Sequence, residues 1–557
     1  MKVLAAGIVL SLVLLIQTLG VCQVTAQIEW SDVYTADKLP DEAGWGASKG
    51  TNTSSEITPE GLHLKDSGTA NTELHCYSRR WPAQPDRGSV AEATVKAVSC
   101  TARSGMCLMV ADGVHEDVLT FYPDRIELNN SALKYAMDTT DAFHTYQVRI
   151  CGLNIEVWVD GKLAIDGWNK FQAPAYGKRC VVQFGSISSA STGEAYWKDV
   201  RYSVNILSAE QIAGAKNVNI YYKEGIYACF PSLIRTADGT LVTGFGTRVR
   251  RSHIDGTGGS ARYLSKDGGY TWEQTTETFT DPAHVREDGA IISPHAQGWI
   301  YVPDTELEKV KAGGRRWMKA REGTIAYLGE PRVSITMPGK TPETKDLPNP
   351  DIRGVMTFNP SAFLHRGKLW MTAIYGGPTG QPMGVWVIRS EDDGNTWEVL
   401  PVALPADKKL GYGEAAICDN GRGEILCVMR PDPESYDTYQ CFSKDDGKTW
   451  SKPEDCRFWG YPSNVILLKD GRLLCSYGYR RDAMGVRAVL SSDGGHTWDV
   501  DKEIVIRCDG KGSPSDMGYP ISLQMEDGHI FTIYYLNDAA NVTHIAGTHW
   551  NLPPAKQ

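Results

Sequence analysis

The chain has 557 residues, of which 41% are hydrophobic and 22% charged, a globular profile that excludes a disordered or fibrous protein. Its formal net charge of −10 and pI of about 5.7 argue against nucleic acid as a partner, because the basic footprint of such binders is missing. The 56 glycines, 25 tyrosines and 16 tryptophans suit many short strands joined by tight turns, which favours an all-β fold.

The N-terminus has the pattern of a targeting segment. A lysine precedes an apolar run from Val3 to about Leu19, and small residues follow up to Ala26. This predicts a signal peptide over residues 1–26 and therefore a secreted, periplasmic or extracellular protein. Two alternatives are a membrane anchor, for which the run is barely long enough, and a lipoprotein signal acylated at Cys22. No other stretch is apolar enough to span a membrane.

Thirteen cysteines are present, and twelve remain if the signal peptide is removed. No Cys-x-x-Cys pair occurs, so zinc is not indicated. Export permits disulfides, and Cys418 with Cys427, or Cys441 with Cys456, are close enough in sequence to bridge hairpins. Buried free thiols fit the pattern equally well.

Residues 27–205 are expected to form one β-rich domain. A turn at Val159–Lys162 joins two alternating apolar runs, as in a hairpin. The runs His144–Ile150 and Ile155–Gly161 together resemble concanavalin-like jelly-roll (β-sandwich) domains, which implies either carbohydrate binding or a structural spacer. Residues 206–216 are expected to form a short helical linker. The strands expected in this domain include Ala91–Val98, Cys107–Ala111, Tyr146–Cys151, Ile155–Val159 and Val181–Phe184.

Residues 217–557 repeat one unit six times: an apolar strand, a glycine-containing turn and a second apolar strand. A repeat of roughly 40–60 residues with several strands indicates propeller blades, so we predict a six-bladed β-propeller. The tail His544–Trp550 is expected to supply the last strand that closes the ring. The six units begin at Pro231, Ala290, Pro360, Glu414, Pro462 and Pro520.

A sharper motif, Ser-x-Asp-x-Gly-x-Thr-Trp, occurs four times between these units. Asp can accept hydrogen bonds from the backbone of its own turn, Gly can take a positive φ, and Trp can pack between neighbouring blades. We therefore expect a structural role for these motifs. They resemble the Asp boxes, or BNR repeats, of the sialidase (neuraminidase) superfamily, and the resemblance covers the whole C-terminal region. The four aspartates are Asp267, Asp392, Asp445 and Asp493.

The resemblance implies a glycoside hydrolase site at the mouth of the central channel. Sialidases use tyrosine as the nucleophile, because a carboxylate on the anomeric carbon would repel an anionic attacker. A neighbouring glutamate must take the tyrosine proton, since free tyrosine has a pKa near 10. Tyr519, Glu414 and Arg430 match the nucleophile, the base and a substrate-binding arginine. The alternatives are a core or channel-lining tyrosine and a Glu414–Arg430 ion pair across one hairpin.

The same resemblance places the general acid/base at Asp255, in the loop before the first Asp box. The arginine-rich loop would lower the pKa of this carboxyl group, whereas a general acid needs a raised one. His253, whose unperturbed pKa suits the task better, is therefore a rival acid or base and a candidate substrate contact. A solvated Asp-Gly turn is the structural alternative for Asp255.

One feature departs from the sialidase pattern: Cys229 stands where the family has the first of three arginines that hold the substrate carboxylate. Besides Arg430, the arginine candidates for this clamp are Arg480 or Arg481 and, more weakly, Arg487. Cysteine cannot replace a bidentate guanidinium, so sialic acid is in doubt as the substrate while the fold is not.

Three further segments carry candidates for substrate contact. Arg248, Arg250 or Arg251 could reach into the site from the first blade. Arg286, which opens the second blade, could contact the sugar or form a structural salt bridge. The segment 304–350 could shape one wall of the site or be a decorated surface loop.

The favoured function is an exo-acting glycoside hydrolase that removes a terminal acidic or deoxy sugar, sialic acid included, from a glycan or polysaccharide. The alternatives are a lyase on the same propeller and a non-catalytic glycan- or protein-binding propeller. No cofactor or metal is expected; some relatives bind calcium, but no EF-hand-like ligand cluster is present. The sequence leaves the oligomeric state open.

Overall fold

The computed structural model describes residues 28–554, apart from 69–73, 188–190, 207–209, 250–257, 278–284, 296–298, 316, 348–355, 358–363, 378–381, 407–408, 433–435, 482 and 512–515. The predicted signal peptide and Cys22 lie outside the described residues. The described chain is almost entirely β and contains one α-helix, α1 (Leu307–Ala312). None of the helices described is long and apolar enough to cross a membrane. The chain divides at Ser208/Ala209 into two compact units.

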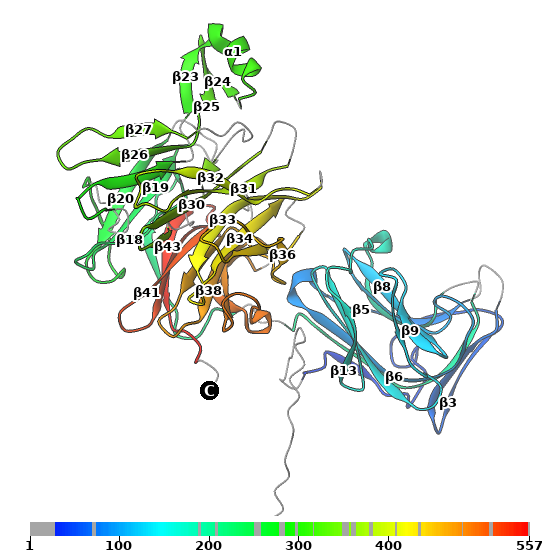
Figure 1. The fold of residues 1–557 in the computed structure, drawn as a ribbon. Coiled ribbons are helices and arrows are strands. Elements are labelled where there is room, and N and C mark those ends of the chain that lie inside the picture. The colour runs from blue at the N-terminus through cyan, green and yellow to red at the C-terminus, as the bar shows by residue number, and fades with distance from the viewer. Residues whose placement is uncertain are drawn as a thin grey trace, which may run out of the picture. The chain divides into compact units, whose positions relative to one another are not determined.

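The first unit is a sandwich of two antiparallel sheets around one shared aromatic and aliphatic core (Figure 1). One sheet pairs β13 (Lys162–Gly167), β12 (Asn154–Val159), β11 (His144–Cys151), β6 (Ser89–Cys100), β15 (Gly193–Val204), β4 (Gly61–Asp66) and β3 (Thr53–Thr58), with β1 (Asp32–Tyr34) beside β15. The other pairs β10 (Leu133–Ala136), β9 (Arg125–Leu128), β8 (Glu116–Tyr122), β7 (Cys107–Asp112), β14 (Cys180–Ser186), β5 (His75–Arg80) and β2 (Gly46–Lys49).

The predicted strands of this unit are all present, and so is the predicted hairpin. Asp160 and Gly161 connect β12 to β13, and both have the positive φ that a two-residue turn of the primed type requires. Trp197 and Phe184, one from each sheet, contact each other in the core at a ring-centroid distance of 5.0 Å. The resemblance to concanavalin-like domains stays a prediction.

Among its described residues the second unit holds seven antiparallel sheets, and we number six of them as blades 1–6 in chain order (Figure 1). Blade 1 holds β17 (Tyr227–Cys229), β18 (Ile234–Arg235), β19 (Leu241–Arg248), β20 (Gly259–Ser265) and β21 (Glu273–Gln274). Blade 2 holds β22 (Ile291–His295), β26 (Arg332–Thr336) and β27 (Glu343–Asp346). Blade 3 holds β28 (Met356–Thr357), β29 (Leu364–Arg366), β30 (Leu369–Gly376), β31 (Gly384–Ser390) and β32 (Glu398–Ala403).

The remaining blades have four strands each. Blade 4 holds β33 (Gly411–Asp419), β34 (Ile425–Asp432), β35 (Tyr439–Ser443) and β36 (Glu454–Asp455). Blade 5 holds β37 (Ser463–Leu467), β38 (Leu473–Tyr479), β39 (Gly485–Ser491) and β40 (Ile504–Arg507). Blade 6 holds β41 (Gly518–Gln524), β42 (Ile530–Asn537), β43 (Thr543–Trp550) and β16 (Lys216–Tyr221). This arrangement is the predicted six-bladed propeller.

The ring closes differently from the prediction in one respect. The tail strand β43 does lie in blade 6, but its outer neighbour is β16, the strand that precedes blade 1. Closure therefore joins the two ends of the unit through main-chain hydrogen bonds. The helix expected within residues 206–216 is absent from the described residues 210–216. The Ile212 N–H bonds to the Val505 carbonyl of blade 5 instead, so tertiary contacts override the local helix propensity.

The segment 304–350 also differs from the expected loop. It contains β26 and β27, the second and third strands of blade 2. A small separate sheet of β23 (Trp299–Pro303), β25 (Thr324–Leu328) and β24 (Trp317–Arg321) is inserted between β22 and β26, and it carries α1. This insertion separates β22 from its partner β26 in the sequence.

The four Asp boxes form the same turn on four blades. In the first, Asp267 accepts hydrogen bonds from the Thr271 hydroxyl at 2.6 Å, the Thr271 N–H at 3.0 Å and the Ser265 hydroxyl at 2.8 Å. Corresponding bonds surround Asp392, Asp445 and Asp493. The box glycine has a positive φ and packs closely against the preceding blade, as Gly495 does against Leu426. These contacts agree with the predicted structural role.

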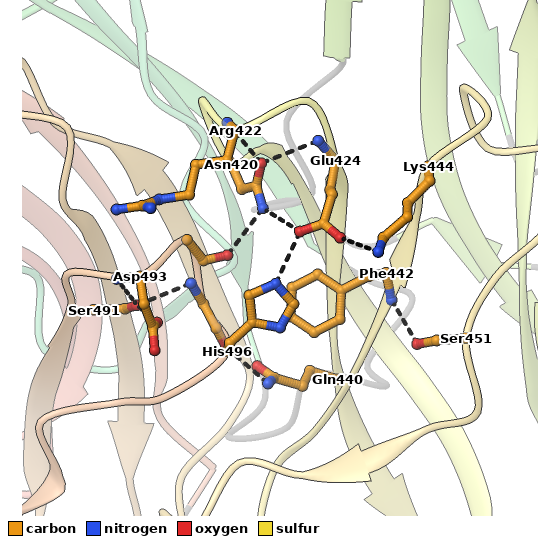
Figure 2. A network of polar contacts seen from close by, with 12 residues as sticks. Asn420, Arg422, Glu424, Gln440, Phe442, Lys444, Ser451, Ser491, Asp493 and His496 are labelled. Atoms are coloured by element: carbon orange, nitrogen blue, oxygen red, sulfur yellow. Dashed lines mark hydrogen bonds and ion pairs between the residues drawn. The ribbon is translucent and has the colours of Figure 1, made fainter.

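Figure 2 shows the network that joins the box turn of blade 5 to blade 4. Glu424 of blade 4 accepts a hydrogen bond from Asn420 at 3.0 Å and lies 2.9 Å from the Nε2 atom of His496 in the box. The His496 ring stacks on Phe442 at 4.3 Å. Gln440 donates to the carbonyl of Gly495 at 2.8 Å. Side chains outside the motif therefore complete the seam between the two blades.

All twelve cysteines among the described residues are free thiols, and nine of them are buried. Cys418 and Cys427 cannot bridge their hairpin, because Cys427 pairs in register with Ile417 and so points to the opposite face from Cys418. The sequence left open hairpin disulfides or buried free thiols, and the structure has free thiols, most of them buried.

Candidate active site

The backbone is strained at three positions on the inner strands. Phe230, Glu414 and Tyr519 have φ values of 56°, 40° and 50°, a left-handed conformation that side chains other than glycine rarely adopt. The β33–β34 and β41–β42 ladders break their register around Glu414 and Tyr519. Such a residue costs about 1–3 kcal/mol and persists only where its surroundings hold it. Bulges of this kind re-aim side chains, and the side chains of Glu414 and Phe230 both contact Tyr519.

The structure joins Tyr519, Glu414 and Arg430, as the sequence predicted. The Tyr519 hydroxyl donates a hydrogen bond to Glu414 Oε1. Arg430 Nη1 donates to the other carboxylate oxygen, Oε2, at 2.5 Å. The Glu414–Arg430 ion pair, which the sequence analysis gave as the structural alternative, is therefore present. The Glu414 carboxylate also contacts Tyr519, the candidate nucleophile. Glu414 is 9% and Tyr519 7% exposed, so both groups are largely shielded from water.

The surroundings of Tyr519 keep its phenol protonated. Burial raises its pKa well above the usual value of 10, and the nearby negative charge of Glu414 raises it further. Arg480 acts in the opposite direction and is outweighed. The phenol can therefore act as a nucleophile only while Glu414 removes its proton, and the hydrogen bond between them provides the path.

Asp516 is a site residue that sequence reasoning missed. Its carboxylate accepts hydrogen bonds from the hydroxyls of Tyr227, at 2.7 Å, and Tyr535, at 2.9 Å. Arg480 lies 3.3 Å from the same carboxylate and also donates to the carbonyl of Met517 at 3.2 Å. The only available signal was an acidic residue shortly before the Tyr519 strand, which is too weak to separate from a loop aspartate.

Aromatic rings enclose Tyr519. Phe230 meets it edge-to-face at a centroid distance of 4.7 Å, and the Tyr535 ring lies at 5.6 Å. Phe230 also contacts Tyr535 at 5.6 Å. These apolar walls exclude water from one side of the phenol, which is the main cause of its raised pKa.

The other predicted residues fall in different places. Asp255 and His253, with Arg250 and Arg251, lie outside the described residues. Arg286 lies at the rim, where it pairs with Asp288 at 2.5 Å and donates to Asn395 of the second Asp box at 3.1 Å. No described contact joins it to Tyr519.

Two other arginines that the sequence offered for the substrate carboxylate are held by partners of their own. Arg487 pairs with Glu503 at 2.5 Å and lies over the Tyr479 ring. Arg481 lies over the Trp459 ring at 3.9 Å. Among the described residues, no group of three or more His, Cys, Asp or Glu is placed to hold a metal ion.

Comparison with known proteins identifies residues 334–532 as a BNR repeat-like domain. Among solved structures, a Dyadobacter fermentans protein of unknown function is 25% identical, with 61% of this chain and all of that chain covered and a TM-score of 0.49. An intramolecular trans-sialidase from leech is 12% identical over 88% of this chain and 98% of its own, with a TM-score of 0.41. A Trypanosoma rangeli sialidase is 14% identical over 60% and 59%, with a TM-score of 0.39.

Proposed function

We propose that this chain, which contains a BNR repeat-like domain over residues 334–532, is a secreted, exo-acting glycoside hydrolase of the sialidase-like superfamily that removes a terminal sugar from a glycan. The observation that carries this proposal is the hydrogen bond from Tyr519 to Glu414, made between two blades by two residues in strained backbone conformations. A buried Tyr–Glu pair supported by an arginine has the parts that an activated tyrosine nucleophile needs.

The proposed reaction proceeds in two steps. Glu414 takes the hydroxyl proton of Tyr519 while the phenolic oxygen forms a bond to the anomeric carbon, and the bond to the leaving oxygen breaks. A general acid protonates that oxygen; Asp255 and His253 remain the candidates for this role. Water then displaces the tyrosine from the anomeric carbon and gives one proton to the residue that acted as the general acid, and the phenol regains its proton from Glu414. Two displacements at one carbon predict retention of configuration.

Arg430 has a positioning role in this scheme. Its guanidinium holds one carboxylate oxygen of Glu414, which leaves the other oxygen directed at Tyr519. Arg480, held by Asp516, lies on the other side of Tyr519 and favours the phenolate as it forms.

The test is release of an aryl group from a panel of glycosides that includes a sialoside, uronides and several neutral and deoxy sugars. The proposal is supported if wild type hydrolyses at least one of these glycosides and the Tyr519→Phe variant does not. An unsaturated product absorbing in the ultraviolet would instead indicate a lyase. Tight glycan binding without any product would indicate a non-catalytic binding propeller.

A further inference from the structure

Blades 4 and 6 carry the same backbone bulge at the candidate active site. In blade 4, Glu414 and the residue after it stand opposite a single residue of β34. In blade 6, Tyr519 and the residue after it stand opposite a single residue of β42. Both bulges begin with a residue of positive φ. Because a bulge re-aims the side chain of its extra residue, these two bulges direct the candidate base and the candidate nucleophile.

Phe230 begins a corresponding bulge in blade 1. Cys229 lies opposite Gly246 on β19, and the Ser232 N–H bonds to the Gly244 carbonyl at 2.8 Å. Phe230 and the proline that follows it therefore stand opposite a single residue of β19. Phe230 has a φ of 56°, like the first residue of the other two bulges. It occupies in blade 1 the position that holds the reacting pair in blades 4 and 6, yet the proposed reaction gives it no task.

The backbone of Phe230 is in an unfavourable conformation. Side chains other than glycine rarely adopt a positive φ and lose free energy when they do. Pro231, which follows, restricts the backbone of Phe230 further. Glycine would take this conformation without the penalty. A phenylalanine at this position therefore points to a task for the ring.

The ring of Phe230 lies against Tyr519. Their edge-to-face contact has a centroid distance of 4.7 Å and an interplanar angle of 70°. Tyr535 contacts the phenol from the neighbouring strand of blade 6, and its own hydroxyl is held by Asp516. Phe230 reaches the phenol from a different blade. Since it has no hydroxyl group, it does not compete with Tyr519 for the carboxylate of Glu414.

We propose that Phe230 is a positioning residue, whose ring fixes the phenol of Tyr519 in the orientation that directs the hydroxyl to Glu414. The proposal rests on the function proposed above and adds a third blade to its machinery. Without this ring the phenol can turn away from the carboxylate, and the hydrogen bond that carries the proton is formed less often. A loss of this kind lowers kcat and kcat/KM by the same factor and leaves KM unchanged.

The first test observes the phenol directly and does not need turnover. Fluorotyrosine placed at position 519 gives a fluorine NMR signal that follows the protonation of this phenol alone. The signal should titrate at a higher pH than free fluorotyrosine, since burial and Glu414 raise the pKa of Tyr519. Phe230→Leu should lower this titration point by about one pH unit, because both the burial and the contact with Glu414 are weakened.

A matched control lies in the same blade. The ring of Phe245 packs on Tyr221 and Tyr263, away from the candidate active site. Phe245→Leu should therefore leave the titration of the label at position 519 unchanged. Circular dichroism would check that each variant is folded.

The second test uses the glycoside that wild type hydrolyses best. Phe230→Leu should lower kcat by roughly 10- to 100-fold with KM unchanged, whereas Phe245→Leu should keep the kcat of wild type. Phe230→Gly removes the ring and also relieves the backbone, so it should lose at least as much activity while remaining folded.

A titration point and a kcat that are both unchanged in Phe230→Leu would overturn the proposal. Equal changes in Phe245→Leu would overturn it as well, since they would show a general effect of loosened packing. A shifted titration point in Phe230→Leu, in a protein that hydrolyses none of the glycosides, would support the positioning contact and refute the hydrolase.

Discussion

The Asp-box rim and the mouth of the propeller are built on opposite principles. At the rim, four turns repeat one set of hydrogen bonds, and the positive φ values that each box needs include that of its motif glycine. At the candidate active site, three blades contribute different side chains from strained backbone positions, namely Phe230, Glu414 and Tyr519, and opposite charges meet in partly buried pairs. The regular Asp-box turns stabilise the ring of blades, whereas the irregular inner strands carry the residues of the candidate active site.

This comparison first predicts that a small chemical change at the mouth has a large effect on activity. Glu414→Gln keeps the shape of the side chain but cannot accept the Tyr519 proton. Turnover should fall by roughly 10²- to 10⁴-fold, measured as kcat on the best aryl glycoside of the panel. The melting temperature should change little. An active Glu414→Gln enzyme would remove the proposed base.

A second change at the mouth should act through position. Asp516→Asn removes the charge that holds Arg480 but keeps an acceptor for Tyr227 and Tyr535. We expect kcat/KM to fall by roughly 10- to 100-fold, because Arg480 shifts beside Tyr519. Asp538→Asn is the matched control, since that carboxylate accepts a bond from Tyr222 at an exposed site. Equal effects of both variants would mean that Asp516 is merely structural.

The rim should give the reverse result. Glu424→Gln weakens the contact with His496 that joins blades 4 and 5, and also the ion pair with Lys444 within blade 4. The melting temperature should fall by about 2–4 °C, as measured by scanning calorimetry, with activity at 25 °C unchanged. Loss of activity in the folded variant would mean that the seam and the mouth are coupled.

The smallest expected effect is a change in acid stability. The Thr449 hydroxyl and the backbone of the turn lower the pKa of Asp445 to about 2. A lowered folded-state pKa adds stability above the unfolded value near 4, and this stability is lost as the pH falls through about 2. The melting temperatures of wild type and Asp445→Asn should therefore differ at pH 7 and converge toward pH 2. A difference that grows on acidification would contradict this.

The same comparison explains which parts of the fold and of the candidate site can be predicted from the sequence. The box motif specifies a local turn, so its spacing revealed the blades, and the resemblance placed Tyr519, Glu414 and Arg430 together. Asp516 could not be found in that way. Its role depends on contacts with Tyr227 and Tyr535, which belong to blades 1 and 6 and are far from each other in the sequence.

The strand that pairs with β22 in blade 2, and the strand that pairs with β43 at the ring closure, were missed for a related reason. Pairing between β22 and β26 spans an inserted sheet, and pairing between β16 and β43 spans the whole unit. No local pattern encodes contacts over such distances along the chain.

The most direct test of the central claim compares Tyr519→Phe with Asp267→Ala, using kcat/KM on the glycoside that wild type hydrolyses best and the melting temperature of each protein. The account predicts that Tyr519→Phe is inactive and melts as wild type does, whereas Asp267→Ala is active and melts at a lower temperature. An active Tyr519→Phe protein, or an Asp267→Ala protein that loses activity without losing stability, would contradict it.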